Sequence, residues 1–165
     1  MSLRAQSIGV TLIVAALSFP WLFGMAGEPS EGDFDPLFTT FSIAARDAAT
    51  GDLGVAVSTR AAAVGSVVPW ARAGVGAVAT QAWTNPDFGP RGLDLLASGM
   101  APREALAKLL VEDATPERRQ VGIVNASGVA ASHTGLENLA WAGAVEGAGF
   151  TAQGNLLTGR ETVEA

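Results

Sequence analysis

From residue 39 onward the chain is a series of short segments in which apolar residues alternate with polar ones or follow one another directly. Segments of this length and pattern are typical of β-strands, and the Gly-, Asp- and Ser-containing stretches between them are typical of turns. The pattern predicts strands at residues 39–46, 53–59, 74–82, 120–125, 129–133 and 150–157. The first two of these strands and the pair at 120–133 are each joined by a short turn sequence and are predicted to form hairpins.

Two helices are predicted in the middle of the chain. Residues 90–98 begin with a proline, which favours the first turn of a helix, and end before a glycine. In residues 101–112 the side chains of Leu106, Leu109 and Leu110 recur at helical spacing and form one apolar face.

Residues 61–73 have no clear assignment, because Pro69 would interrupt a strand. Antiparallel hairpins on both sides of two helices favour an α+β fold over a parallel α/β fold. The sheets are therefore predicted to be mainly antiparallel, with helices packed on them.

The first 26 residues have the pattern of a secretory signal peptide. Arg4 precedes an apolar run at residues 8–23, and the small residues Gly24 and Ala26 fit a peptidase site, which places the cut after Ala26. The alternative is an uncleaved membrane anchor, but the run of about 16 residues is short of the roughly 20 that span a bilayer, and Pro20 lies within it. We expect a secreted or periplasmic protein that meets the membrane only transiently, through this segment.

Residues 27–38 are polar, acidic and contain two prolines, so they are interpreted as a linker or propeptide. Residues 39–165 are then one domain, long enough to enclose a hydrophobic core.

The composition excludes several classes of function. Sixteen acidic and ten basic residues give a net charge of −6, which disfavours binding to nucleic acid. Cysteine is absent and His133 is the one histidine, so neither a disulfide framework nor a zinc site is expected. Residues 74–79 match G-x-G-x-x-A, but they lie in strand-like sequence without a following helix. No cofactor and no metal are predicted.

Thr39 and Thr40 stand where the linker meets the first strand. If cleavage made such a threonine the first residue, its α-amine, with a pKa of about 7.7–8.0, would serve as the base for its own hydroxyl. This chemistry needs neither cysteine nor histidine. Two alternatives remain open: both threonines simply begin a β-branched strand, or His133 acts as the base of a serine triad.

Many short motifs of this chain, in the same order, resemble the family called domain of unknown function 1028. The resemblance covers residues 40 to the end. It is carried by TFSIAAR and GVAVSTR at 40–46 and 54–60, by VGS at 64–66, PWARAGVGA at 69–77 and ATQA at 79–82, by TNP and GPRGL at 84–93, and by RRQVG, HTG and QGN at 118–122, 133–135 and 153–155.

This family is similar in fold to the N-terminal nucleophile hydrolases, which implies a four-layer αββα sandwich and points to Thr40 rather than Thr39 as the nucleophile. The pattern from Thr40 to Arg60 also looks like the opening of proteasome β subunits. An acidic residue of those subunits is replaced here by Ser58, and the single lysine, Lys108, lies on a predicted helix. Relatives continue beyond the last predicted strand, so the resemblance implies a domain that is incomplete at its C-terminus.

Two functions follow. The first is an exported amidohydrolase in which Thr40 attacks a small-molecule or peptide-like substrate. Candidate oxyanion donors are the side-chain amides of Gln81, Asn85 and Asn155. Arg60 is a candidate for holding a substrate carboxylate, and Trp83 is a further substrate-binding candidate.

The second function is a non-catalytic envelope domain that binds a partner or a glycan through a loop carrying Trp83 and Phe88. A homo-oligomer is compatible with both functions.

Overall fold

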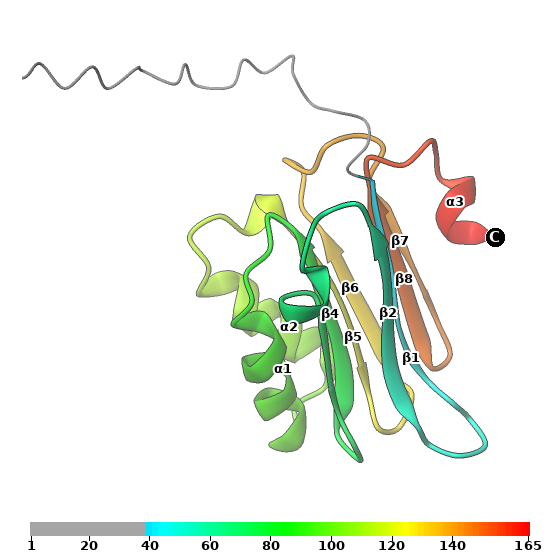
Figure 1. Ribbon diagram of the computed structural model, residues 1–165. Coiled ribbons are helices and arrows are strands. Elements are labelled where there is room, and N and C mark those ends of the chain that lie inside the picture. Colours follow the sequence, from blue (N-terminus) through cyan, green and yellow to red (C-terminus); the bar gives the residue numbers. More distant parts are fainter. Residues whose placement is uncertain (1–38) are drawn as a thin grey trace, which may run out of the picture. The chain divides into compact units, whose positions relative to one another are not determined.

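The computed structural model describes residues 39–165, which form two four-stranded antiparallel sheets and three helices (Figure 1). Sheet A consists, in spatial order, of β2 (Leu53–Thr59), β1 (Thr40–Arg46), β8 (Phe150–Asn155) and β7 (Gly143–Gly147). Sheet B consists of β3 (Pro69–Arg72), β4 (Gly76–Ala82), β5 (Arg119–Asn125) and β6 (Ala130–Thr134). The helices are α1 (Phe88–Ala97), α2 (Pro102–Val111) and α3 (Glu161–Glu164), and short 3-10 turns lie at Val64–Ser66 and Pro116–Arg118.

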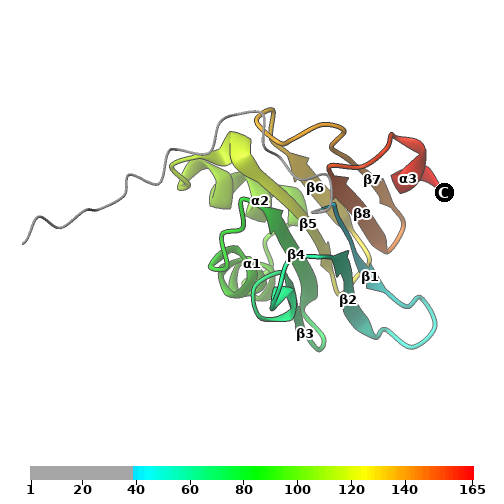
Figure 2. The same cartoon turned by 45° about the horizontal axis from the view of Figure 1, so that its top comes forward.

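The elements are stacked in layers. Helices α1 and α2 cover one face of sheet B, and sheet A packs on the other face, as two views of the ribbon show (Figures 1 and 2). The short α3 contacts β7 and β8 of sheet A. Sheet B is thus covered on both faces within the described residues, which explains why β4 and β5 are almost entirely buried.

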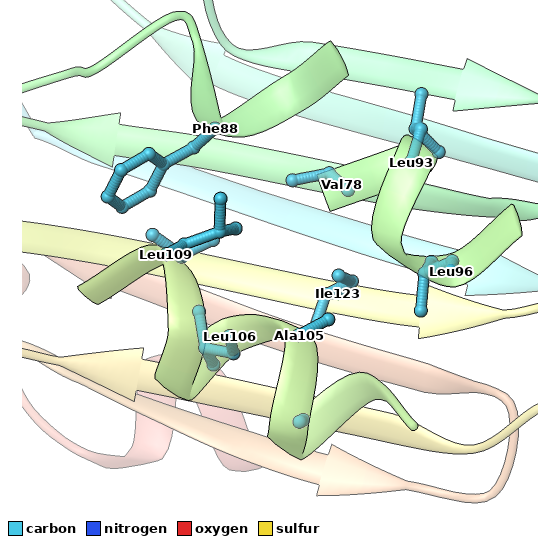
Figure 3. Close-up of a cluster of buried hydrophobic side chains, with 10 residues drawn as sticks. Val78, Phe88, Leu93, Leu96, Ala105, Leu106, Leu109 and Ile123 are labelled. Carbon is cyan, nitrogen blue, oxygen red and sulfur yellow. The ribbon is translucent and has the colours of Figure 1, made fainter. Parts of the chain in front are cut away.

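The main hydrophobic core lies between the two long helices and sheet B (Figure 3). Phe88 and Leu109 are fully buried there, and Leu96 and Leu106 are nearly so. Together with Leu93 of α1 and Ala105 of α2, these side chains face Val78 and Ile123 of sheet B. Burial of one such large side chain stabilises the fold by about 1.5–3 kcal/mol, so this interface fixes the helices on the sheet.

A second apolar cluster lies between the two sheets. Ala44, Ala77 and Ala79 are fully buried there, and their small side chains allow close approach of the strands. Val68 and Val124 complete the buried part of this cluster, and β2 packs against it through Leu53, Val55 and Val57. The remaining space between the sheets is filled by polar groups.

The outer face of sheet A is apolar and only partly covered. Phe41, Ile43, Val145 and Phe150 border a groove of about 380 Å³ beside α3. Helix α3 contributes Val163, which is 6% exposed, to one side of this groove.

The predicted antiparallel α+β fold and both hairpins are confirmed. Thr40 lies opposite Thr59 in the β1–β2 pair, and β5 pairs antiparallel with β6. Both predicted helices are present, and α2 buries Leu106 and Leu109 while Leu110 packs at the edge of the core.

The structure also differs from the predictions. Pro69 does not prevent a strand: it begins β3, an edge strand, where the missing N–H removes no bond from the interior of the sheet. Strand β7 and helix α3 were not predicted. The predicted last strand is two residues too long, because Leu156 adopts a left-handed φ of 55° directly after β8.

The two glycines of the G-x-G-x-x-A motif have structural roles. Gly74 has a φ of 70° in the turn between β3 and β4, so the strand starts at Gly76 rather than at 74. A Cβ at Gly76 would collide with the Leu96 side chain and the Val124 carbonyl oxygen. The motif therefore enters an antiparallel strand and serves close packing, as its strand-like sequence indicates.

The predicted signal peptide (1–26) and linker (27–38) lie outside the described residues. Within residues 39–165, no helix is both long and apolar enough to cross a membrane.

Candidate functional site

Four buried side-chain amides gather between the two sheets at one end of the sandwich. Gln81 of β4, Gln120 of β5, and Gln153 and Asn155 of β8 are between 0% and 6% exposed. We call these four residues the amide cluster. A buried amide without partners costs several kcal/mol, so the hydrogen bonds within this cluster decide whether it can exist and how it is oriented.

Gln120 is at the centre of the amide cluster. Its Oε1 accepts hydrogen bonds from Gln81 Nε2 at 2.8 Å and from Asn155 Nδ2 at 2.9 Å. Its Nε2 donates to the Gly154 carbonyl oxygen at 2.8 Å and to Thr134 Oγ1 at 3.1 Å. One side chain therefore connects strands β4, β5, β6 and β8 across the sandwich.

Gln153 is held by hydroxyl groups on its own sheet. Its Nε2 donates to Ser42 Oγ at 2.7 Å, and its Oε1 accepts from Thr151 Oγ1 at 2.9 Å. The side chain lies against Gly122 of the opposite sheet, where a Cβ would stand 2.7 Å from Gln153 Cδ. Gly122 is thus required for this side chain to fit between the sheets.

Thr40 is the first residue of β1 and lies next to the amide cluster. It pairs with Thr59 of β2 on one side and with Asn155 of β8 on the other. Directly opposed residues in antiparallel strands have Cβ atoms about 4.5–5.5 Å apart on the same face. The Thr40 and Thr59 hydroxyl oxygens are 3.0 Å apart, and Thr59 Oγ1 also accepts the Ala61 N–H at 3.2 Å.

The structure separates the three predicted oxyanion donors. Gln81 Nε2 donates to Gln120 Oε1 and to the Gln153 carbonyl oxygen, so both of its amide hydrogens have acceptors. Its Oε1 is buried and without a hydrogen-bond partner among residues 39–165. Asn155 uses one amide hydrogen toward Gln120 and lies directly opposite Thr40.

Asn85 belongs to a different cluster, in the loop between β4 and α1. Its Nδ2 donates to Asp113 Oδ2 at 2.8 Å, and Arg119 Nε donates to the other carboxylate oxygen at 3.0 Å. The Asp113 side chain is only 2% exposed. Burial by itself raises the pKa of Asp113, but hydrogen bonds from Asn85, Thr115 and Arg119 outweigh it, so the pKa lies below its ordinary value. This cluster fixes the loop.

Trp83 is 55% exposed in the same loop, in agreement with its predicted position at the surface. The Arg118 guanidinium lies 5.3 Å from the centre of its ring and pairs with Glu137 at 2.7 Å. Phe88 was predicted to share this exposed loop, and that prediction is wrong. It is the first residue of α1 and is fully buried, because it anchors the helix in the main core.

Arg60 directly follows Thr59 at the end of β2 and is exposed. The other arginines near this end of the sandwich, Arg118 and Arg119, are neutralised by carboxylates. Within residues 39–165, no carboxylate lies within ion-pair distance of Arg60.

His133 lies on β6 and not beside Thr40 in either strand pair. Its Nε2 is 2.9 Å from the Pro116 carbonyl oxygen, which binds the ring to the loop before β5. No group of three or more His, Cys, Asp or Glu residues in the described part of the chain could hold a metal ion.

Sequence reasoning missed two residues of this site, Thr59 and Gln120, and also the buried Gln153 beside them, whose side chain bonds to neither Thr40 nor Asn155. A usable signal was present in β5, where Gln120 begins a run of apolar and glycine residues that occupies both faces of the strand. A glutamine in such a run is buried and must find partners. The identity of the partners depends on the packing of the two sheets, which the strand pattern does not specify.

Fold and site together define an α+β protein of two packed antiparallel sheets, with a threonine hydroxyl and a buried amide cluster at one strand end. The chain belongs to the DUF1028 family, described as a family of unknown function, whose profile matches residues 40–165.

A solved structure supports the same assignment. The crystal structure of protein SPO2555 from Silicibacter pomeroyi, a DUF1028 protein, is 33% identical and superposes with a TM-score of 0.74. The match covers 77% of this chain and 59% of that protein, so the chain spans less than two thirds of its relative. No curated protein matches this chain.

Proposed function

We propose that this protein is an exported amidohydrolase whose nucleophile is Thr40, made N-terminal by cleavage of the preceding residues. The observation that carries this proposal is the position of the Thr40 hydroxyl at the first residue of a central strand. Thr59 Oγ1 lies 3.0 Å away on one side, and on the other side Thr40 is paired with the buried residue Asn155 of β8. The same residue would then hold both nucleophile and base.

In the proposed reaction the Thr40 hydroxyl proton passes to the α-amine as Oγ1 attacks the substrate carbonyl carbon. The resulting oxyanion is stabilised by nearby N–H donors, among which Asn155 has an amide hydrogen not used by Gln120. The C–N bond then breaks, and the ammonium returns its proton to the leaving amine. Water hydrolyses the acyl ester on Oγ1, which releases the acid and restores the hydroxyl.

The substrate class follows from Arg60. An exposed guanidinium next to Thr59, with no carboxylate partner in the described residues, is suited to a substrate that carries a carboxylate near the scissile amide. Trp83 and Asn85 lie on the loop after β4 and would border the substrate rather than contact the reacting atoms.

The test is hydrolysis of a panel of N-acyl p-nitroanilides by protein that begins at Thr40. We expect repeated turnover from this protein, and none from protein that begins at Gly27, in which the Thr40 nitrogen is an amide. The Thr40→Ala variant retains a free α-amine and therefore controls for the reactivity of that amine. Loss of turnover in this variant would assign catalysis to the hydroxyl. Thr40→Ser should retain part of the activity and His133→Ala nearly all of it. Equal turnover by Thr40→Ala and its parent would refute the proposal.

Export rests on the sequence of residues 1–26 and is tested separately. Fractionation of the producing cell, with N-terminal sequencing, should find a mature chain outside the cytoplasm. Full-length chain confined to the cytosol would contradict the proposed export but would not test the proposed reaction.

The αββα architecture is also a proposal. The apolar outer face of sheet A, with Phe41, Ile43 and Val145 beside the groove at α3, is the kind of surface that a second helical layer buries. The structure of a full-length family member that leaves this face open to solvent would contradict it.

A non-catalytic binding domain is the second candidate. The observation in its favour is Trp83, which is 55% exposed and stacked against the Arg118 guanidinium in a loop fixed through Asp113. Aromatic surfaces of this kind bind sugars and partner proteins. A folded protein that begins near Gly27 in its mature form and binds a glycan through Trp83 would favour this function over the first.

A further inference from the structure

Gln120 is the member of the amide cluster that bonds to both Gln81 of β4 and Asn155 of β8, and its own orientation is fixed by backbone carbonyl groups. Its Nε2 faces two carbonyl oxygens, those of Gly154 at 2.8 Å and Gly143 at 3.3 Å, in addition to Thr134 Oγ1. Carbonyl oxygens accept hydrogen bonds and cannot donate them. A rotation of the Gln120 amide by half a turn would therefore place oxygen against oxygen.

The fixed orientation of Gln120 determines the orientation of its neighbours. Because Nε2 must face the carbonyls, Oε1 must face Asn155 and Gln81. Asn155 can meet this oxygen only with its Nδ2, so its amide is also held in one of its two orientations. Asn155 lies directly opposite Thr40 across the β1–β8 pair.

We propose that Gln120 is a positioning residue that sets the amide orientation of Asn155 beside the Thr40 hydroxyl. The inference rests on the proposed function, in which Asn155 is an oxyanion donor, and it adds a residue that touches no reacting atom. Loss of the Oε1 acceptor leaves the Asn155 amide free to turn its oxygen toward the developing negative charge, where it would repel the charge instead of stabilising it.

Gln153 provides a matched control. It is as deeply buried as Gln120 and belongs to the same amide cluster, but its side chain bonds to Ser42 and Thr151 and not to Asn155. A purely structural role for Gln120 predicts equal effects of the two substitutions on function. A positioning role predicts a functional loss at position 120 alone.

The first experiment compares Gln120→Met and Gln153→Met, both in protein that begins at Thr40, with acetyl and glutaryl p-nitroanilides as substrates. For Gln120→Met we expect kcat to fall about 10²-fold with KM little changed, as for other misplacements of a group in the transition state. For Gln153→Met we expect a lower urea midpoint and a kcat within about threefold of the parent, because the Asn155 contact is intact. A folded Gln120→Met protein with the kcat of its parent would overturn the inference.

Gln120→Glu keeps the inference testable if the methionine variant does not fold. In its neutral form the carboxyl reproduces the native pattern, with one oxygen accepting from Asn155 and the hydroxyl donating to the Gly154 carbonyl. Burial raises the pKa of such a group, and ionisation would place an acceptor against that carbonyl. The pH profile of kcat should therefore acquire a descending limb at high pH that the parent lacks. A profile identical to that of the parent would contradict the proposal.

The Asn155 side-chain amide signals in NMR spectra separate the two hypotheses. We expect Gln120→Met to shift them and to accelerate their hydrogen exchange, while Gln153→Met leaves them nearly unchanged. If the parent hydrolyses no amide but this difference is seen, the proposed function fails and the positioning contact stands. If the parent is active and the two variants show no such difference, the inference fails alone.

Discussion

Gln153 of sheet A lies directly against Gly122 of sheet B, and the two residues define how closely the sheets approach beside the amide cluster. A Cβ at position 122 would stand 2.7 Å from Gln153 Cδ and 2.7 Å from Thr151 Cγ2. Both polar atoms of the Gln153 amide group are already bonded, to Ser42 Oγ and Thr151 Oγ1, so withdrawal of the side chain from Gly122 would break these hydrogen bonds.

Gly122→Ala is therefore expected to lower the free energy of unfolding by about 1–3 kcal/mol, the usual cost of overpacking a core. Urea denaturation measures this change in the free energy of unfolding. Gly54→Ala is the matched control, because Gly54 is also a strand glycine but a Cβ there meets nothing within 4 Å. Its effect should lie within about 0.5 kcal/mol of zero. Equal midpoints for the two variants would mean that the sheets separate easily at Gly122.

Asp113→Asn is expected to remove an acid-sensitive part of the stability. The hydrogen bonds to Asp113 lower its pKa in the folded state, so the carboxylate stabilises the fold above the unfolded pKa of about 3.9 and ceases to do so as the pH falls through the lower folded pKa. Breaking a pair this buried costs roughly 3 kcal/mol at pH 7. Thermal unfolding between pH 2 and 7 should show parent and variant converging toward acid. A difference in stability between parent and variant that stays the same from pH 2 to 7 would contradict a lowered pKa for Asp113.

Thr59→Val should slow p-nitroanilide hydrolysis by protein that begins at Thr40 roughly 5- to 10-fold, because it removes the hydroxyl that lies 3.0 Å from Thr40 Oγ1. The two side chains have nearly the same shape, so the fold is retained. Thr59→Ser keeps the hydroxyl and should stay within about twofold of the parent. Loss of activity in both variants alike would assign the effect to packing instead of to the hydroxyl.

Arg60→Gln tests the proposed substrate class. For a glutaryl p-nitroanilide, whose acyl chain ends in a carboxylate, KM should rise about tenfold with kcat unchanged, as expected for the loss of one charge-assisted contact. For the neutral acetyl p-nitroanilide no change is expected. Arg72→Gln removes an arginine that already pairs with Asp94 at 2.9 Å, and it serves as the control for net charge. A KM that is equally raised for both substrates would argue against a carboxylate contact.

The hairpins and the two long helices could be predicted because their signals are local. Alternating residues in β1 and β2 and the spacing of Leu106 and Leu109 in α2 each specify which face is buried. Strand β7 lacks such a signal, because a single branched residue, Val145, stands among Gly, Ala and Glu. It exists because β8 offers a free edge, which is a tertiary effect.

The candidate site was predictable in part for the same reason. Thr40 and Asn155 stand in motifs that mark strand ends, and the pairing of β1 with β8 brings them together. Gln120 and Gln153 acquire their roles in part from hydrogen bonds to residues far away in the sequence, such as Asn155, 35 positions from Gln120, and Ser42, 111 positions from Gln153. Such contacts depend on how the two sheets pack face to face. The error at Phe88 has a different cause: the residues before it resemble a loop, and this conceals the start of α1.

The strand order has a consequence for how the protein is made. Sheet B and its two helices are built from consecutive elements, whereas β1 in the middle of sheet A must wait for β8, whose Gln153 lies 111 residues after its partner Ser42. At ordinary translation speeds of about 5–20 residues per second this delay is on the order of ten seconds. Throughout that interval the edge of β1 that β8 later covers has no partner strand, so the unfinished chain can pair there with another chain.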